Sequence, residues 1–250
     1  MHINENKEKM DEIIRRLKRF SFEKLFRMVR TILSKEKKVS VRERQGTIDN
    51  FHRLFFQDKC DRFKWFGVDI IKYPTDLITY QEIIYETKPD LIIECGTNQG
   101  GSALFFAHLF DLIGKGEIVT IDIYNKKGPR HNRINYLNGK STSREILEQV
   151  KGFLGKGKRV MVVLDSDHDK NNVLNELKAY NKMVSEGCYL IVEDSNMNGH
   201  PVHKNFGAGP MEAIEEFMKN NNDFEIDKTR ERFLLTANPR GFLKKIRSKH

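Results

Sequence analysis

Short apolar runs alternate with helical patterns along the chain from Pro74 onward. Each run is rich in Val, Ile and Leu, as in strands that are buried on both faces of a parallel sheet, and a stretch with apolar residues at helical spacing follows it. We expect strands at residues 91–95, 117–122, 159–165 and 188–193, with a weaker candidate at 134–137. We expect the helices at residues 102–113, 142–153, 171–185 and 211–221.

Two further apolar runs, at residues 224–226 and 233–236, have no helix-length segment between them. We expect them to pair as an antiparallel hairpin, because a parallel pair needs a longer crossover connection. The alternation of strands and helices before them indicates an α/β domain. A mostly parallel, Rossmann-like sheet that ends in an antiparallel hairpin is the arrangement of class I methyltransferases, although a fold alone does not assign a function.

The chain up to about Phe56 has a different pattern, in which apolar residues recur at helical spacing and Lys and Arg lie on the opposite face. The apolar positions are Ile13, Ile14, Leu17, Phe20, Phe22, Leu25, Phe26, Val29, Ile32 and Leu33. We therefore predict a basic helical segment at residues 1–58, followed by the α/β domain at residues 59–250.

The net charge confirms that this segment is distinct. The 250 residues include 44 Lys and Arg against 35 Asp and Glu, and residues 15–44 alone contain 12 basic and 3 acidic side chains, which is the whole surplus of +9. A basic helix can bind phosphate or an anionic membrane, but a helix packed on its own core or on a second subunit has the same pattern and is commoner. We expect a homo-oligomer, with peripheral membrane contact as the alternative. Nucleic acid binding is disfavoured, because aromatic and basic residues are not interleaved in the α/β domain.

The cysteines and the apolar runs indicate the compartment. Cys60, Cys95 and Cys188 are widely spaced and form no C-x-x-C pair, which argues against a disulfide framework and a zinc ribbon. No apolar run approaches the roughly 18 residues that a membrane span needs, and the first residues are polar. We expect a cytoplasmic protein, peripheral at the inner membrane surface if the basic helices bind lipid.

A glycine-bearing turn follows the first expected strand, in the sequence Glu94-Cys95-Gly96-Thr97-Asn98-Gln99-Gly100-Gly101-Ser102. Glycines at the start of a helix let a ligand approach the backbone amides, although a tight strand-to-helix turn also requires glycine. Asp122 ends the next strand, where an acid can accept hydrogen bonds from a ribose. S-adenosylmethionine fits such a site, and the lack of G-x-G-x-x-G spacing makes NAD the weaker candidate. The candidate cofactor-binding residues are Glu94, Gly96, Thr97, Asn98, Gln99, Gly100, Ser102, Asp122 and Asp165.

Three acids stand at the ends of the next two strands: Asp165, Glu193 and Asp194. Carboxylates that converge at one sheet edge repel each other unless a cation lies among them, and hard oxygen ligands suit Mg²⁺ or another hard divalent cation. Such a metal can hold a substrate hydroxyl and lower its pKa. His168 is a candidate catalytic base, with a helix cap as the alternative. His200 and His203 lie on a loop with Gly and Pro that could cover a substrate.

From about Trp65 to Lys245 the chain resembles the family named after cephalosporin hydroxylase, whose members look like S-adenosylmethionine-dependent, metal-assisted O-methyltransferases. The segments that carry the resemblance are Trp65-Phe66-Gly67-Val68, Pro74-Thr75-Asp76-Leu77, Tyr80-Gln81-Glu82, Glu94-Cys95-Gly96-Thr97, Leu164-Asp165-Ser166-Asp167-His168, Val192-Glu193-Asp194, Asn198-Gly199-His200-Pro201-Val202, Gly209-Pro210-Met211-Glu212-Ala213 and Arg230-Glu231-Arg232-Phe233-Leu234-Leu235-Thr236. The resemblance implies Asp165, Glu193 and Asp194 as metal ligands and the turn with Asp122 as the cofactor site.

We therefore predict O-methylation of a hydroxyl on a sugar, a glycolipid or polysaccharide, or a natural product. An iron hydroxylase is disfavoured, because its metal triad usually uses H-x-D or H-x-E and none of the eight histidines has an acid two residues later. One alternative is a Rossmann-type oxidoreductase that binds NAD or a nucleotide sugar. Another is a nucleic-acid or membrane binding module that uses the basic N-terminal helices.

Overall fold

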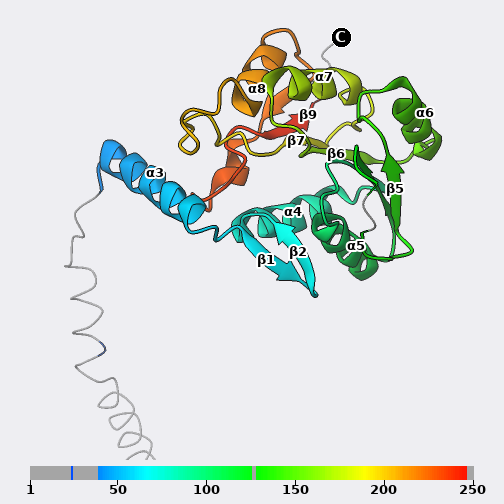
Figure 1. Cartoon of the computed structure of the whole chain (residues 1–250), viewed down its shortest axis with the longest axis horizontal. Coiled ribbons are helices and arrows are strands. Elements are labelled where there is room, and N and C mark those ends of the chain that lie inside the picture. The colour runs from blue at the N-terminus through cyan, green and yellow to red at the C-terminus, as the bar shows by residue number, and fades with distance from the viewer. Residues whose placement is uncertain (1–23, 25–38, 126–127, 247–250) are drawn as a thin grey trace, which may run out of the picture. The chain divides into compact units, whose positions relative to one another are not determined.

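The computed structural model describes residue 24 and residues 39–125 and 128–246 (Figure 1). The helices expected before residue 39 therefore lie outside the described residues. Helix α3 (Val41–Gln57) confirms the helical pattern at the end of the basic segment. The chain groups into two units, Met1–Gln45 and Gly46–His250. A functional boundary at residue 58 stays a prediction. No helix among the described residues has both the length and the apolar character to cross a membrane.

Seven strands form the central sheet, in the order β5-β4-β3-β6-β7-β9-β8. They are β3 (Leu91–Cys95), β4 (Glu117–Asp122), β5 (Ile134–Asn138), β6 (Val160–Leu164), β7 (Tyr189–Val192), β8 (Phe224–Ile226) and β9 (Phe242–Lys245). The first five in this order run parallel, whereas β9 is antiparallel to both of its neighbours. All five expected parallel strands are confirmed, including the weaker candidate.

The second strand of the expected hairpin is not where the sequence indicated. Residues 233–236 form a turn after a short 3₁₀ helix (Lys228–Glu231), and β9 at Phe242–Lys245 pairs with β8 in their place. A strand inside a sheet is covered on both faces, and Phe242 and Leu243 are fully buried, whereas Phe233 and Leu234 are partly exposed. Gly241 allows the chain to enter the sheet, since a Cβ there would lie 2.1 Å from the carbonyl oxygen of Val192.

Helices cover both faces of the sheet (Figure 1). Helices α4 (Pro74–Thr87) and α5 (Gly101–Ile113) lie on one face, and α6 (Arg144–Phe153), α7 (Lys170–Tyr180) and α8 (Pro210–Lys219) lie on the other. Alternate strand residues enter the two apolar cores: Ile92 packs with α4 and α5, and Ile93 packs with α6 and α7. This alternation explains why the strands are continuous apolar runs in the sequence.

Three elements near the start of the α/β unit were not expected: two short strands and helix α4. Strands β1 (Arg62–Trp65) and β2 (Val68–Ile71) form an antiparallel hairpin outside the central sheet. Trp65 anchors it on α5, with its ring centroid 5.0 Å from that of Phe105. Helix α4 follows directly and begins with Pro74 at a position that tolerates proline. The hairpin brings its last residues to the carboxyl edge of the sheet.

Helix α7 ends five residues before its expected end. The side chain of Asn181 donates hydrogen bonds to the carbonyl oxygens of Leu177 and Lys178, at 2.9 and 2.8 Å. The carbonyl of Leu177 also accepts the backbone amide of Asn181, at 3.1 Å. The side chain of Asn181 thus adds a donor for the carbonyl groups of the last helical turn, where the helix ends.

Candidate functional site

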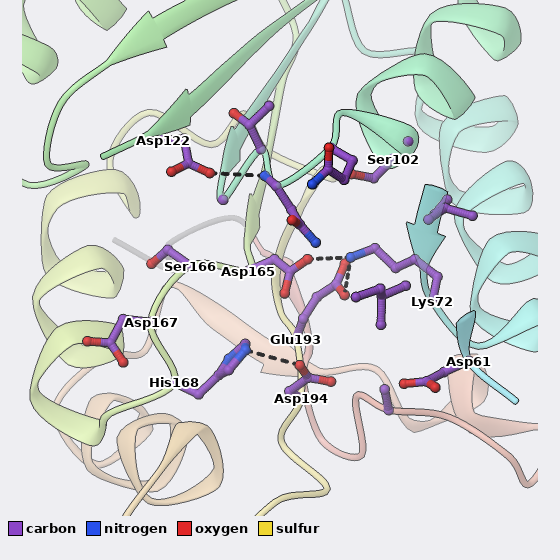
Figure 2. A pocket seen from close by; sticks show the side chains of 18 of the residues that line it. Asp61, Lys72, Ser102, Asp122, Asp165, Ser166, Asp167, His168, Glu193 and Asp194 are labelled. Atoms are coloured by element: carbon purple, nitrogen blue, oxygen red, sulfur yellow. Dashed lines mark hydrogen bonds and ion pairs between the residues drawn. The ribbon is translucent and has the colours of Figure 1, made fainter. Parts of the chain in front are cut away.

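A cavity of about 850 Å³ lies along the carboxyl edge of β3, β4, β6 and β7. The glycine-bearing turn and Asp122 form one part of its wall. Asp165, His168 and Asp194 form another part. Figure 2 shows these groups facing a common space. The residues predicted from separate motifs are thus brought into one site.

Close contacts within the protein require glycine at two positions of the glycine-bearing turn. A Cβ on Gly96, whose φ is +104°, would lie 1.8 Å from the carbonyl oxygen of Asp165. A Cβ on Gly101 would lie 2.4 Å from the carbonyl oxygen of Asp69. The glycines therefore let the turn pack against the end of β6 and against β2, and residues 97–99 line the cavity.

Asp122, at the end of β4, holds this turn in place through hydrogen bonds. Its Oδ2 accepts a hydrogen bond from the backbone amide of Asn98 at 3.0 Å, and its Oδ1 accepts one from the amide of Tyr124 at 2.9 Å (Figure 2). A carboxylate has about four lone-pair sites, so these two bonds leave acceptor capacity on the side that lines the cavity. Asp122 can both shape the turn and accept bonds from a ligand.

Of the predicted cofactor residues, all but Glu94 and Gly100 line the cavity. Glu94 is fully buried beneath the turn and accepts a hydrogen bond from Thr120 at 2.6 Å. Burial raises the pKa of Glu94 to about 7, against the opposing hydrogen bonds of Ser102 and Thr120. Glu94 therefore supports the turn from below.

Asp165, His168 and Asp194 converge at the ends of β6 and β7. The imidazole Nε2 of His168 lies 3.2 Å from Oδ2 of Asp194, and ligand atoms of all three side chains lie within 4.8 Å of one another. Burial raises the pKa of Asp194, the nearby His168 opposes this rise and Asp165 adds to it. The two carboxylates are oxygen ligands that a hard divalent cation accepts, so the residues present fit such an ion.

Asp194 reaches this place through an unusual backbone conformation. Its φ is +54°, in the left-handed region that non-glycine residues seldom adopt. The side-chain oxygen of buried Asn238 accepts a hydrogen bond from its amide at 3.0 Å and holds it there. Strain of this kind gathers at functional sites, where surrounding contacts maintain it.

The third predicted metal ligand, Glu193, has protein partners. Its Oε2 lies 2.6 Å from the ammonium of Lys72, and its Oε1 accepts a hydrogen bond from Tyr80 at 2.5 Å. The same ammonium pairs with Asp165 (Figure 2). Burial and the charge of Asp165 raise the pKa of Glu193, whereas Lys72 and Tyr80 stabilise its charged form.

Lys72 was missed by the sequence analysis. It follows β2 and is buried, with only 3% of its side chain exposed. Burial by itself lowers the pKa of Lys72, but the charges of Asp165 and Glu193 outweigh this effect and hold the pKa well above its usual value. In the sequence, Lys72 is visible only as a lysine between an apolar run and Pro74. This pattern does not indicate which acids the lysine pairs with.

The histidines separate into different roles. His168 does not cap α7, because Asp169 is the N-cap and accepts hydrogen bonds from the amides of Asn171 and Asn172. His203 lines the cavity and packs edge-on against Phe56, with ring centroids 5.6 Å apart. His200 instead pairs with Glu212 at 3.0 Å.

Comparisons with known proteins match most of the chain. Residues 57–246 match the family model described as rhamnosyl O-methyltransferase/CmcI. A curated rhamnosyl O-methyltransferase of Mycobacterium tuberculosis (strain ATCC 25618 / H37Rv) is 37% identical over 229 residues, which cover 88% of this chain and 93% of the relative. One from Mycobacterium leprae (strain TN) is 38% identical over 204 residues, 78% of this chain and 89% of that relative.

Two solved structures of CmcI have the same fold. The apo structure aligns with a TM-score of 0.59 at 20% identity and covers 74% of this chain and 77% of that chain. A structure with Mg and SAM in its title aligns with a TM-score of 0.58 at 21% identity, with the same coverage. The class I methyltransferase fold expected from the sequence is confirmed.

Proposed function

The chain belongs to the rhamnosyl O-methyltransferase/CmcI family, and from this premise we propose that it transfers the methyl group of S-adenosylmethionine to a sugar hydroxyl with the help of Mg²⁺. The observation that carries the proposal is that one cavity joins the turn and Asp122 to the acids at the ends of β6 and β7. The family favours methyl transfer over the NAD-dependent alternative.

Two parts of the cavity suit the two cofactors. The backbone of residues 97–99, with Asp122, would hold the ribose and amino acid parts of S-adenosylmethionine. Asp165 and Asp194 would hold the divalent cation. Glu193, the third predicted ligand, has both of its oxygens bound to Lys72 and Tyr80. When bound, S-adenosylmethionine supplies the methyl group and the cation supplies positive charge that lowers the pKa of a nearby hydroxyl.

His168 is positioned to remove the proton of the acceptor hydroxyl. The carboxylate of Asp194 lies 3.2 Å from Nε2, so it orients the imidazole with Nε2 as the protonated nitrogen and leaves Nδ1 to take the proton. The same carboxylate stabilises the charged imidazole that then forms. As the new O–CH₃ bond forms, the S–CH₃ bond breaks, the hydroxyl proton goes to His168 and S-adenosylhomocysteine leaves. The cavity would hold both reactants in place, and this proximity and orientation would raise the rate of methyl transfer.

The remaining wall of the cavity suits a sugar ring. Phe56, Met197 and His203 present apolar and aromatic surface, on which the C–H face of a sugar can pack. Asp61 also lines the cavity, and among the described residues its carboxylate has no hydrogen-bond or ion-pair partner. It can therefore accept bonds from sugar hydroxyls. The relatives named rhamnosyl O-methyltransferase favour a rhamnose-containing acceptor.

The test measures S-adenosylhomocysteine formed by the purified chain with Mg²⁺ and a set of acceptors: a rhamnoside, a glucoside and a catechol. We expect methylation of the rhamnoside and calorimetric binding of S-adenosylmethionine but not of NAD. Transfer to the catechol alone would contradict the sugar assignment, and binding of NAD alone would contradict methyl transfer.

Three other expectations remain proposals beside this one. They are self-association through the basic segment at residues 1–58, peripheral contact of that segment with a membrane, and a cytoplasmic location. The apolar residues at helical spacing support self-association, and the surplus of basic residues at 15–44 supports contact with an anionic membrane.

A further inference from the structure

One buried cation lies among the acids of the proposed metal site. The ammonium of Lys72 contacts both Asp165 and Glu193, which belong to neighbouring strands of the sheet (Figure 2). Lys72 itself comes from the hairpin outside that sheet, 93 residues before Asp165 and 121 before Glu193. Its stem is enclosed, so the charge cannot be solvated by water in place of these carboxylates.

Charge balance requires a cation at this place. Asp165, Glu193 and Asp194 bring three carboxylates together, and Glu193 is 3% exposed. Like charges in a site shielded from water repel strongly, and an unpaired buried carboxylate destabilises the folded protein. The ammonium of Lys72 offsets one of the three charges without any bound ion.

The same contacts make the ammonium of Lys72 a competitor of a bound metal for Asp165. The cluster with ligand atoms within 4.8 Å contains Asp165 and Asp194 but not Glu193, whose two oxygens are taken by Lys72 and Tyr80. A divalent cation at this cluster would share Asp165 with the ammonium and lie near its positive charge. Two cations that share one carboxylate repel each other, so Lys72 opposes the binding of the metal.

We propose that Lys72 is an internal counter-cation of the metal site: it holds Asp165 and Glu193 together in the metal-free enzyme and weakens the affinity for the divalent cation. Lys72 is thus a positioning residue, which acts through the metal ligands. This inference rests on the proposed metal role of these acids.

The test compares the full-length chain with the variant Lys72→Met, which keeps the apolar stem and removes the charge. Thermal unfolding in a chelator should show a melting temperature lower by about 10 °C. Calorimetric titration with MgCl₂ alone should show an affinity at least about 10-fold higher than that of the unmodified chain. Added Mg²⁺ should therefore raise the melting temperature of Lys72→Met more than that of the unmodified chain.

Two further variants separate charge from packing. Lys64→Met removes a lysine of the same hairpin that forms an exposed pair with Asp69, and it should change neither quantity. The double variant Lys72→Met with Glu193→Gln removes one positive and one negative charge, and its metal-free stability should return toward that of the unmodified chain. This comparison also applies if Lys72→Met folds only with Mg²⁺.

Several outcomes would overturn the proposal. They are an unchanged or weaker Mg²⁺ affinity in Lys72→Met, an unchanged metal-free stability, and a double variant as unstable as Lys72→Met. If Lys72→Met binds Mg²⁺ tightly and the unmodified chain shows no detectable binding, the result supports the proposal. Since none of these measurements uses S-adenosylmethionine or an acceptor, failure here is distinct from failure of the proposed methyl transfer.

Discussion

The imidazole Nε2 of His168 lies 3.2 Å from Oδ2 of Asp194, a contact that links the ends of β6 and β7. The two residues come from loops 26 positions apart in the numbering. The contact places a group that can take a proton beside a carboxylate suited to a metal.

The variant His168→Gln tests the base. The side chain keeps hydrogen-bonding capacity but cannot take a proton, so we expect methyl transfer to slow by about 10²–10⁴-fold. Affinity for Mg²⁺ should change little. The control is His131→Gln, because His131 pairs with Asp111 outside the cavity. A large loss of Mg²⁺ affinity in His168→Gln would instead identify the imidazole as a metal ligand.

Removal of the metal tests the role of the acids. Chelation should slow methyl transfer by at least about 100-fold, because a bound cation contributes several kcal/mol of charge stabilisation. Excess Mg²⁺ should restore the rate of the unmodified chain but not that of Asp165→Ala. If chelator and Asp165→Ala both leave the rate unchanged, the metal-assisted mechanism is wrong.

The variant Asp122→Ala tests the cofactor end of the cavity. It removes the acceptor of the Asn98 and Tyr124 amides as well as a ligand contact, so the Kd for S-adenosylmethionine should rise about 10–100-fold. Calorimetry measures this, with Asp111→Ala as an acid control outside the cavity. Mg²⁺ affinity should not change. Unaltered cofactor affinity would remove Asp122 from the binding site.

The variant His203→Ala tests the acceptor wall. The loss of one aromatic face should raise the KM for the acceptor about 5-fold, since such contacts contribute about 1 kcal/mol. The Kd for S-adenosylmethionine should stay the same. A matched fall in cofactor affinity would show that the ring acts on the whole cavity and does not select the acceptor.

The variant Glu212→Gln tests the anchor of the loop that carries His203. Burial opposes ionisation of Glu212, but the amide of Gly209, together with His200 and Asn198, holds its pKa at about 2. An acid with a lowered pKa stabilises the folded state above its unfolded pKa of about 4.5, and this contribution is lost as the pH falls toward 2.

We therefore expect Glu212→Gln to reduce the free energy of unfolding by about 1–2 kcal/mol at pH 7. The difference between the variant and the unmodified chain should shrink between pH 4.5 and pH 2, as urea unfolding can measure. Glu145→Gln, an exposed acid in the first turn of α6, is the control. A difference that stays constant with pH would exclude the charge of Glu212 as its cause.

Much of the fold could be predicted because the signals are local. A strand covered on both faces is apolar at nearly every position, so runs such as 160–164 and 189–192 are visible without any partner. The acids at strand ends were visible for the same reason. The hairpin strand at 242–245 was missed, because its two lysines conceal a strand whose first two residues are fully buried.

The sequence by itself determined the parallel strands, the helices between them and the presence of carboxylates at the carboxyl edge, because each depends on neighbouring residues and on the common direction of parallel strands. Only the tertiary structure decided that Lys72 pairs with Asp165 and Glu193, that Glu94 lies beneath the turn, and that His168 faces Asp194. These contacts join residues far apart in the chain, and they depend on how the β1–β2 hairpin and the loops pack at the edge of the sheet.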